Sequence, residues 1–297
     1  MLCKNEGAFI DGCLMNLEPI ADEFVIVDTG STDDTLEKIE QFKKYARVPV
    51  RVFHREWQEN FSWARNFAIS QASSRWILHI DPDERIEHTE LQLMARMLDE
   101  PCEAYLFQVI NYLEPFLPHS GKKPVYATTE TLRLFLNKPE IFYSGIVHET
   151  LEDALAARKR RGEGLIIQAP VRIHHHGYLK PKDKLKDKFD MYTRMNEMQI
   201  KVTEGRDPRA FFNLALHYLN ENEEAKAEEL MVRASNTGQK SWRIESQLAT
   251  LYMKKAQDQL LKTNALIPEG HPFKAEVDGI LKWMGERGLK QIKIDTA

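Results

Sequence analysis

Cysteine is scarce in this chain, and a long apolar run is missing. Its 297 residues include only three cysteines, Cys3, Cys13 and Cys102. Their odd number and their spacing argue against a metal knuckle and fit a reducing compartment. Neither a signal peptide nor a segment long enough to span a bilayer is visible in the sequence. We therefore expect the protein to be cytoplasmic.

The chain also lacks a large net charge of either sign. The formal net charge is -4, with 41 Lys and Arg against 45 Asp and Glu. This balance gives no electrostatic case for nucleic-acid binding, although Arg158–Arg161 is a local basic run. We interpret that run as a solvated loop or the end of a helix. The length exceeds that of a usual single domain, so we expect one medium domain and a smaller one.

The most informative feature that is present is an apolar run that ends in carboxylates. Trp76–Ile80 leads directly into Asp81, Pro82, Asp83 and Glu84. Such a run predicts a buried strand whose carboxyl end opens into a cleft. Crowded carboxylates repel one another, and a Mg2+ or Mn2+ ion that bridges to phosphate would neutralise them. The alternative interpretation is a solvated acidic turn before the next helix.

A second strand ends in the same way. Residues 24–27 are apolar and run into Asp28, a turn at Gly30 and a helical pattern over residues 36–42. Glycine permits a tight turn, and early acids suit the positive end of a helix. A carboxylate at this strand end can accept hydrogen bonds from a nucleobase imide or a ribose hydroxyl. The alternative is that Asp28 only shapes the turn.

Strands and helices alternate in the first part of the chain, which predicts an α/β domain. A long loop that contains Pro115, Pro118, His119 and Gly121 lies between two of the expected strands, and it either borders an acceptor site or is a passive surface excursion. We expect helices over residues 10–17 and 64–72, and strands over residues 50–53, 104–110, 131–136 and 165–174.

The remaining sequence predicts helices only. We place the α/β domain at residues 1–179, a helical linker at 180–205 and a helical domain at 206–297. Leu214, Ala215 and Tyr218 recur as Leu248, Ala249 and Tyr252, an offset of 34 residues that equals the tetratricopeptide period. We expect a last helix over residues 273–284. An ordinary helical bundle is the alternative to the tetratricopeptide interpretation. The helical segment is also a candidate surface for self-association.

Short motifs follow one another in a specific order over roughly the first 180 residues. They are Lys4–Glu6, Cys13–Leu14, Val27–Asp33, Phe61–Asn66, Asp81–Glu84, Arg133–Phe135, Gly145–Glu149 and His175–Tyr178. This series resembles family 2 glycosyltransferases of the GT-A fold. It is most similar to a bacterial subgroup that carries tetratricopeptide-like helices, in which peptide S-glycosyltransferases are relatives. The resemblance therefore implies an α/β, Rossmann-like nucleotide-diphospho-sugar transferase domain followed by an all-α segment.

Three positions depart from the family pattern. The family has a full apolar strand before Lys-Asn-Glu, whereas this chain keeps only its end, so we expect a central strand to be short. Two explanations stay open: the chain starts too late, or other residues rebuild this edge of the nucleotide pocket. Pro82 stands where Ala is frequent, which rigidifies the turn. Asn60 replaces a frequent Asp, which removes a charge and leaves Arg65 intact.

The resemblance implies roles for residues that bind the donor. Asp83 would hold the metal, Mn2+ or Mg2+, and Asp81 would contribute to metal or ribose contacts. Asp28 would help to hold the nucleoside, and Arg65 would assist at the diphosphate. His175 is implied as a further metal or diphosphate ligand. Alternation along the preceding strand would direct His174 and His176 elsewhere.

The resemblance also implies a base. Glu149 is our candidate for the group that deprotonates the acceptor, with Glu152 and Asp153 as competitors. The implied reaction is an inverting transfer of a hexose from a nucleotide sugar, a UDP-sugar by expectation, to a peptide, protein or cell-envelope glycan. Two alternatives stay open: a noncatalytic scaffold with a degenerate GT-A domain, and a nucleotidyltransferase. A nucleotidyltransferase should carry a glycine-rich, basic phosphate loop, and none is visible.

Overall fold

The structure is a computed structural model that describes residues 1–114, 125–177, 185–239 and 241–286. Its internal contacts divide the chain into two units, Met1–Lys188 and Phe189–Ala297. The loop around Pro115 and the first part of the expected linker lie outside the described residues. Within the described ranges, every helix is too short or too polar to cross a bilayer.

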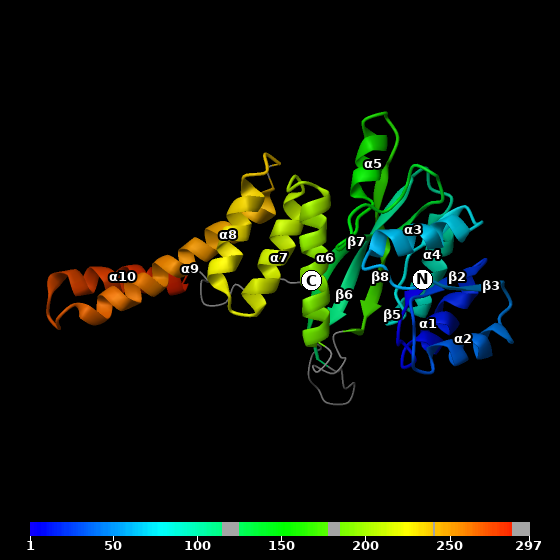
Figure 1. Cartoon of the computed structure of the whole chain (residues 1–297), viewed down its shortest axis with the longest axis horizontal. Helices are drawn as coiled ribbons and strands as arrows, with labels where there is room; N and C mark the ends of the chain where they lie inside the picture. The colour runs from blue at the N-terminus through cyan, green and yellow to red at the C-terminus, as the bar shows by residue number, and fades with distance from the viewer. Residues whose placement is uncertain (115–124, 178–184, 240, 287–297) are drawn as a thin grey trace. The chain divides into compact units, whose positions relative to one another are not determined.

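The first unit contains two sheets (Figure 1). Three parallel strands form the smaller sheet in the order β1-β2-β3. β1 spans only Leu2–Cys3, which confirms the expected short strand. The smaller sheet and its helices comprise β1, α1 (Ile10–Leu17), the 3-10 helix η1 (Glu18–Ile20), β2 (Phe24–Asp28), α2 (Thr35–Lys43), β3 (Val50–His54) and α3 (Phe61–Gln71).

The larger sheet is mixed and has the strand order β4-β7-β6-β8-β5. β6 pairs antiparallel with β7 and parallel with β8. β6 and β7 are longer than the sequence pattern predicts, whereas β8 has the predicted length. The strands and helices of this part are β4 (Trp76–Leu78), β5 (Glu84–Arg85), α4 (His88–Met97), β6 (Ala104–Tyr112), β7 (Tyr126–Leu136), α5 (Glu152–Lys159) and β8 (Ile166–His175).

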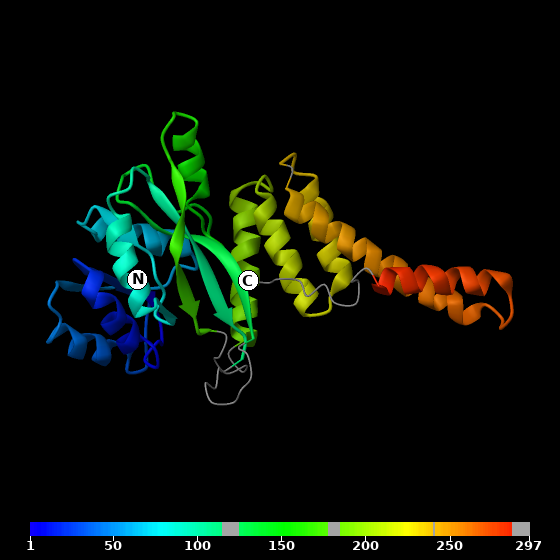
Figure 2. The same ribbon diagram turned by 180° about the vertical axis from the view of Figure 1, so that it is seen from behind.

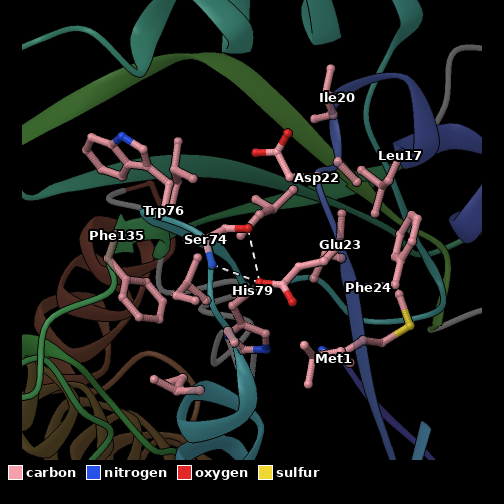
Figure 3. Close-up of a pocket in the computed structure, with 18 of the residues that line it drawn as sticks. Met1, Leu17, Ile20, Asp22, Glu23, Phe24, Ser74, Trp76, His79 and Phe135 are labelled. Carbon is pink, nitrogen blue, oxygen red and sulfur yellow. Dashed lines mark hydrogen bonds between the residues drawn. The ribbon is translucent and has the colours of Figure 1, made fainter. Parts of the chain in front are cut away.

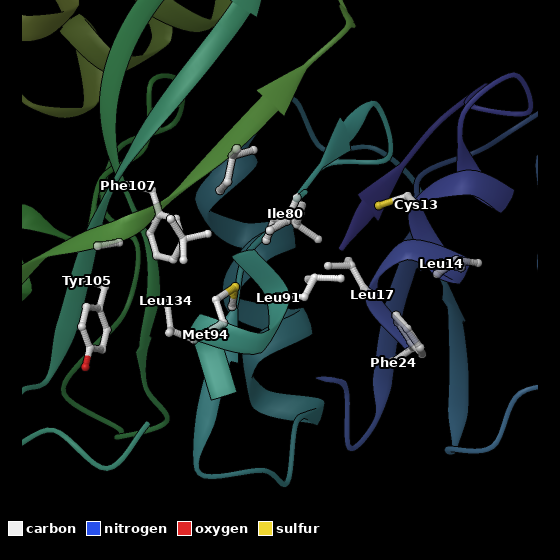
Figure 4. Packing of buried hydrophobic residues seen from close by; sticks show 14 of the residues in the cluster. Cys13, Leu14, Leu17, Phe24, Ile80, Leu91, Met94, Tyr105, Phe107 and Leu134 are labelled. Carbon is white, nitrogen blue, oxygen red and sulfur yellow. The ribbon is translucent and has the colours of Figure 1, made fainter. Parts of the chain in front are cut away.

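One apolar core joins the two sheets of this unit. Leu17 of α1 and Leu91 and Met94 of α4 are buried, as are Leu134 and Phe107 of the larger sheet. Figure 4 shows the two α4 side chains between the larger sheet and α1. Burial of such a side chain contributes about 1.5–3 kcal/mol, so this core fixes the strand ends that carry the acidic residues.

The basic run after α5 differs in part from its prediction. Arg158 does lie at the end of a helix, but its side chain is buried. Its Nε donates to Glu103 Oε2 at 2.6 Å, and its Nη2 lies 2.8 Å from Glu163 Oε2. The interpretation as solvated is therefore wrong for Arg158. It holds for the exposed Lys159, Arg160 and Arg161.

The second unit is helical, as predicted (Figure 2). Leu214 and Ala215 are buried against the following helix, as a tetratricopeptide unit requires. The positions 34 residues later behave differently, because Leu248 is buried whereas Ala249, the counterpart of Ala215, is exposed. The tetratricopeptide assignment therefore stays a prediction. The helices are α6 (Leu185–Val202), α7 (Pro208–Asn220), α8 (Glu224–Ser235), α9 (Trp242–Leu266) and α10 (Pro272–Glu286).

Candidate active site

Asp83 and His175 are brought together by one short strand pair. β5 pairs antiparallel with β8 so that Glu84 lies opposite His175. The N–H of His176 also donates to the carbonyl of Asp83 at 2.9 Å. Nε2 of His175 consequently lies 3.5 Å from Oδ1 of Asp83. Although burial lowers the pKa of His175, the adjacent Asp83 carboxylate raises it overall.

Asn111 and Gly177 shape the surroundings of this pair. Nδ1 of His175 lies 2.8 Å from Oδ1 of Asn111, so the imidazole carries its proton on Nδ1 in order to donate. This tautomer leaves Nε2 as the nitrogen that faces Asp83. A Cβ atom on Gly177 would lie 2.4 Å from Oδ2 of Asp83 and 2.5 Å from Nε2 of His175. Only glycine therefore fits beside the two side chains.

The neighbours of His175 in the strand lie on the other face of the sheet. The rings of His174 and His176 both stack on Tyr112, with centroid distances of 5.9 Å and 5.1 Å. The Tyr112 hydroxyl lies 2.8 Å from Nδ1 of His174. The structure thus places His175 alone of the three beside Asp83, as strand alternation predicts.

Asp81 lies among cationic side chains. Its Oδ1 is 3.4 Å from Nη1 of Arg65 and 3.4 Å from Nε2 of His79, and its Oδ2 is 3.5 Å from Nη1 of Arg133. Burial alone would raise the pKa of Asp81, but Arg65, with help from His79 and Arg133, holds it well below its usual range. Asp81 is therefore an anion that balances two buried guanidinium groups. Its metal or ribose role stays a prediction.

Glu84 belongs to the same network. Nη2 of Arg133 donates to its Oε1 at 2.6 Å, and the N–H of Asp81 donates to its Oε2 at 2.8 Å. Burial, together with the charge of Asp81, raises the pKa of Glu84 to about 7 in spite of Arg133. Asp83 is 6% and Glu84 1% exposed, so the alternative of a solvated acidic turn is wrong.

His79 links this network to Tyr143. Nδ1 of His79 lies 2.5 Å from the Tyr143 hydroxyl, and its Nε2 contacts Arg65. Burial, followed by the charges of Arg65 and Arg133, lowers the pKa of His79 well below its usual value. The imidazole is therefore neutral at pH 7. It contacts the positively charged Arg65 and Arg133 without adding a third positive charge.

Glu149 reaches the network through Arg65. Nε of Arg65 donates to Oε1 of Glu149, and both side chains are nearly buried. Burial disfavours the charged form of Arg65, yet Glu149 and Asp81 raise its pKa above the usual value. Arg65 projects from α3, whose first turn is capped by the Asn60 side chain, which accepts the N–H of Trp63 at 2.9 Å.

A small polar cavity lies beside Glu149. Its volume is about 160 Å³, and its lining includes Arg65, Arg133 and the carboxylates of Glu130, Glu149 and Glu152. The other competitor for the role of base, Asp153, instead accepts a hydrogen bond from the Ser144 hydroxyl at 2.5 Å. Glu149 thus faces a space that a small hydroxyl-bearing or thiol-bearing group can enter.

Asp28 organises the loop after β2. Its carboxylate accepts the N–H of Gly30 at 3.1 Å and the N–H of Ser31 at 3.2 Å. Gly30 has a φ of 106°, a conformation that favours glycine. Asn5 holds the same loop, because its Oδ1 accepts the N–H of Thr32 at 2.7 Å. These contacts show the turn-shaping role of Asp28, and its role at a nucleoside stays a prediction.

Several residues of the site were missed by sequence reasoning. Asn111 and His79 gave a signal, because each is a polar residue inside an otherwise apolar strand pattern. Arg133 stood in a quoted motif, but no role was assigned to it. Tyr143 gave no signal, because an aromatic residue in a loop is not distinctive.

A divalent cation fits the donor set at Asp83 and His175. In the described part of the chain, no group of three or more His, Cys, Asp or Glu side chains is arranged to hold a metal ion. A carboxylate and an imidazole supply two ligands, and Mg2+ and Mn2+ commonly complete their coordination with water and substrate phosphate. The space beside Gly177 lies against Oδ2 of Asp83 and Nε2 of His175, the two atoms that face each other here.

The parallel β1–β3 sheet, Asp28 at the end of β2 and the buried Arg65–Asp81 cluster lie in one α/β domain. Residues 1–146 match the model of the family described as "Glycosyl transferase family 2". The N-terminal domain of this chain belongs to that family. The predicted α/β fold class is thereby confirmed, whereas the transferase activity of the chain stays a prediction.

Two curated relatives extend the similarity. The chain is 31% identical over 181 residues to a TPR repeat-containing protein of Synechococcus elongatus, covering 60% of this chain and 41% of that protein. It is 26% identical over 231 residues to the SPbeta prophage-derived glycosyltransferase SunS of Bacillus subtilis, covering 76% of this chain and 50% of SunS. The chain thus spans about half the length of the curated relatives it matches.

A solved structure is also similar. Residues 1–349 of TarS from S. aureus, in a crystal structure with UDP-GlcNAc, align with 86% of this chain and 86% of the TarS chain. The sequence identity is 14% and the TM-score is 0.49.

Proposed function

We propose that this protein transfers a hexose from a nucleotide sugar to an acceptor, with a divalent metal ion and with inversion at the sugar. The proposal depends on one observation in a family 2 domain. Asp83 and His175 lie side by side, and Asp81, two residues before Asp83, contacts Arg65. Arg65 in turn contacts Glu149. Motif resemblance supports a UDP-sugar as the donor. The acceptor class, a peptide, a protein or a cell-envelope glycan, is left to experiment.

Asp83 and His175 would hold Mn2+ or Mg2+ together with the donor diphosphate. A bound cation of this kind stabilises the negative charge on a departing diphosphate. The protein prepares this site through two contacts: Asn111 fixes the tautomer of His175, and Gly177 leaves room at both ligand atoms. Asp28 and its loop would hold the nucleoside at the end of β2.

Glu149 would accept the proton of the acceptor. A carboxylate can act as general base only when it lies within reach of the proton that it removes. Arg65 binds one of its oxygens, which fixes the carboxylate at the edge of the 160 Å³ cavity. Glu152 lines the same cavity and is the remaining competitor. We propose Glu149, because its position is determined by a buried partner.

Arg65 would act on both halves of the reaction. Its guanidinium contacts Glu149 on one side and Asp81 on the other, and Asp81 stands two residues before Asp83. A buried cation at this position favours the negative charge that develops on the leaving group. Asp81, by balancing Arg65 and Arg133, would keep both guanidinium groups in place.

Incubation with a panel of nucleotide sugars tests the proposal directly. The full chain is assayed for release of the nucleoside diphosphate with Mn2+, and then with EDTA. We expect slow donor hydrolysis for one donor, which EDTA abolishes and which the Asp83→Asn variant lacks. Failure to bind or hydrolyse any donor would favour a noncatalytic scaffold. Release of pyrophosphate from a nucleoside triphosphate would favour a nucleotidyltransferase.

A further inference from the structure

Tyr143 is a buried phenol in the site, and the proposed reaction gives it no role. It is 5% exposed and lines the polar cavity of about 160 Å³ beside Glu149. Burial raises the pKa of Tyr143 above its usual value, so the hydroxyl keeps its proton at pH 7. A buried hydroxyl donates this proton to an acceptor in nearly all proteins. The acceptor of the Tyr143 proton therefore has to be identified.

The contacts of His79 show that His79 is not this acceptor. Nε2 of His79 faces two guanidinium groups: Nη1 of Arg65 contacts it, and Nη1 of Arg133 lies 3.2 Å away. A guanidinium group only donates hydrogen bonds, so Nε2 accepts and is unprotonated. Oδ1 of Asp81 lies farther from Nε2, at 3.4 Å. Nδ1 of His79 consequently carries the ring proton and donates to the Tyr143 hydroxyl, 2.5 Å away.

Two buried donors at the polar cavity thus have a proton to give. The Tyr143 hydroxyl accepts from His79, and within the described ranges no carboxylate or carbonyl lies within hydrogen-bonding distance to accept its own proton. Nε of Arg133, a residue that is 8% exposed and lines the same cavity, is likewise without a hydrogen-bond partner in the described part of the chain. Buried donors of this kind are rare in folded proteins and point to an oxygen atom of a ligand.

Two cavities meet the Tyr143 side chain, and the polar one suits its proton better. The larger cavity, of about 400 Å³, is also lined by His79 and Tyr143. Its Glu23 carboxylate is already bound by the N–H of Ser74, at 2.8 Å (Figure 3). Most of the other side chains that Figure 3 labels around it are apolar, among them Leu17, Phe24, Trp76 and Phe135. A polar ligand therefore fits the cavity beside Glu149.

The lining of the polar cavity indicates the chemistry of that ligand. It combines hydrogen-bond acceptors with donors: the carboxylates of Glu130, Glu149 and Glu152 and the donors of Arg65, Arg133 and Tyr143. A phosphate would meet three carboxylates there, and an ammonium group would meet two guanidinium groups. A sugar hydroxyl is neutral and both donates and accepts. Its proton suits a carboxylate, and its oxygen suits the O–H of Tyr143.

We propose that Tyr143 is a specificity-determining residue: its O–H donates a hydrogen bond to a hydroxyl oxygen of the hexose that is transferred. The inference rests on the proposed function, because the hexose arrives as part of the nucleotide sugar. This hydrogen bond adds affinity for the sugar and none for the nucleotide. A site built to bind a hydroxyl group discriminates against an analogue that lacks it.

Tyr143 is held in one orientation before a ligand binds. Nδ2 of Asn66 donates to the carbonyl of Tyr143 at 2.9 Å, and Oδ1 of Asn66 accepts the N–H of Tyr143 at 2.8 Å. The ring also packs edge-to-face against Phe135 and His79, with centroid distances of 6.0 Å and 5.5 Å. A donor that is fixed in this way loses little conformational freedom when the ligand binds.

The Tyr143→Phe variant tests the proposal, because it removes the hydroxyl and keeps the ring. The full chain is titrated in Mn2+ with the nucleotide sugar that the donor panel identifies, and separately with the corresponding nucleoside diphosphate. We expect affinity for the nucleotide sugar to fall about three- to tenfold, the value of one hydrogen bond, and affinity for the diphosphate to stay within roughly twofold. Unchanged affinity for the nucleotide sugar would overturn the proposal.

Tyr105→Phe is the matched control. It also removes a buried hydroxyl, which donates to the carbonyl of Met97, and Tyr105 lines neither of the two cavities. We expect this variant to bind both ligands as the unsubstituted chain does. An equal loss of sugar affinity in the two variants would show a general effect of a lost buried hydroxyl, and the assignment of Tyr143 would fail.

Donor analogues that each lack one sugar hydroxyl show whether the contact is direct. For the unsubstituted chain we expect one analogue to bind about three- to tenfold more weakly than the parent donor. Tyr143→Phe should bind that analogue and the parent equally, because both changes remove the same hydrogen bond. If every analogue loses the same affinity in both proteins, Tyr143 does not contact the hexose. A chain that binds no nucleotide sugar would instead refute the proposed function, and this inference with it.

Nitrogen-15 NMR of the unliganded protein tests the geometry without any substrate. We expect the spectrum of His79 to show a protonated Nδ1 and an unprotonated Nε2. The reverse pattern would mean that Tyr143 donates its proton to His79, which would leave none for a ligand and would overturn the proposal.

Discussion

The carboxylate of Glu149 and the guanidinium of Arg65 form a buried ion pair in which Nε of Arg65 donates to Oε1 of Glu149. The residues are 84 positions apart, on α3 and on the loop before α5. A general base that is also an ion-pair partner has its orientation fixed before substrate arrives. Because Arg65 also contacts Asp81, the same ion pair links Glu149 to the proposed donor site.

Glu149→Gln should retain donor binding and lose transfer. The amide keeps the shape and can still accept the hydrogen bond from Arg65, but it cannot take a proton. We expect acceptor transfer to fall by roughly two to four orders of magnitude in single-turnover assays. The matched control is Glu152→Gln, which lines the same cavity. A near-normal transfer rate for Glu149→Gln together with a strongly reduced rate for Glu152→Gln would assign the role of base to Glu152 instead.

Asp83→Asn should fold and lose metal-dependent nucleotide binding. The substitution removes a formal charge with little change of shape, and hard cations bind a carboxylate more strongly than a neutral amide oxygen. Calorimetry with UDP and Mn2+ measures the effect, with Asp258→Asn on the exposed face of α9 as control. Unchanged Mn2+-dependent affinity in Asp83→Asn would remove Asp83 from the ligand set.

Gly177→Ala should weaken the same binding without altering any ligand. The added methyl group would lie 2.4 Å from Asp83 Oδ2 and 2.5 Å from His175 Nε2, so one of the two side chains must move. We expect UDP affinity in Mn2+ to fall by about tenfold or more, as for other disturbed metal surroundings. Gly279→Ala is the matched control, because a Cβ there meets nothing within 4 Å. Equal affinities in both variants would show that the pocket at Gly177 adapts.

Glu23→Gln should destabilise the protein in a pH-dependent way. Burial alone would raise the pKa of Glu23, but the N–H groups of Ser73 and Ser74, with Arg51, lower it to about 2 from 4.5. A folded-state pKa below the unfolded value gives stability that is present above pH 4.5 and is lost as the pH falls toward 2.

Denaturant unfolding of both forms across this range measures the effect. We expect the unsubstituted protein to be more stable by about 2 kcal/mol at pH 7, with the difference shrinking below pH 4.5. A difference that stays constant down to pH 2 would show that the charge of Glu23 is not the cause.

Local sequence pattern predicted the elements of this fold well, but it did not predict how distant elements pair. The end of β2 at Asp28 and the turn that holds Asp83 follow from apolar runs that stop at turn residues. The pairing of β5 with β8 could not be predicted, because β5 has only two residues and no apolar alternation. The burial of Arg158 was missed for the same reason, since its partner Glu103 lies 55 residues away.

The same difference between local pattern and long-range pairing applies to the site residues. The position of the His175 side chain beside Asp83 agrees with strand alternation, which is a local property, while its role as a ligand stays a prediction. Arg133 was not assigned, because its contacts with Asp81 and Glu84 depend on the register between β4 and β7. A single sequence contains the residue types of such a cluster but not the long-range register that assembles them.

The strand pair between β5 and β8 has a consequence for how donor binding is coupled to motion. Only Glu84 and Arg85 pair with β8 there, so a ladder of two residues holds Asp83 against His175. Short ladders open locally at a lower free energy than the core of a domain. Opening would separate Asp83 from His175 while the rest of the protein stays folded. If the donor needs both side chains, its observed affinity would be reduced by the free energy needed to keep this ladder closed. The rate at which the nucleotide dissociates would then depend on how often β5 opens.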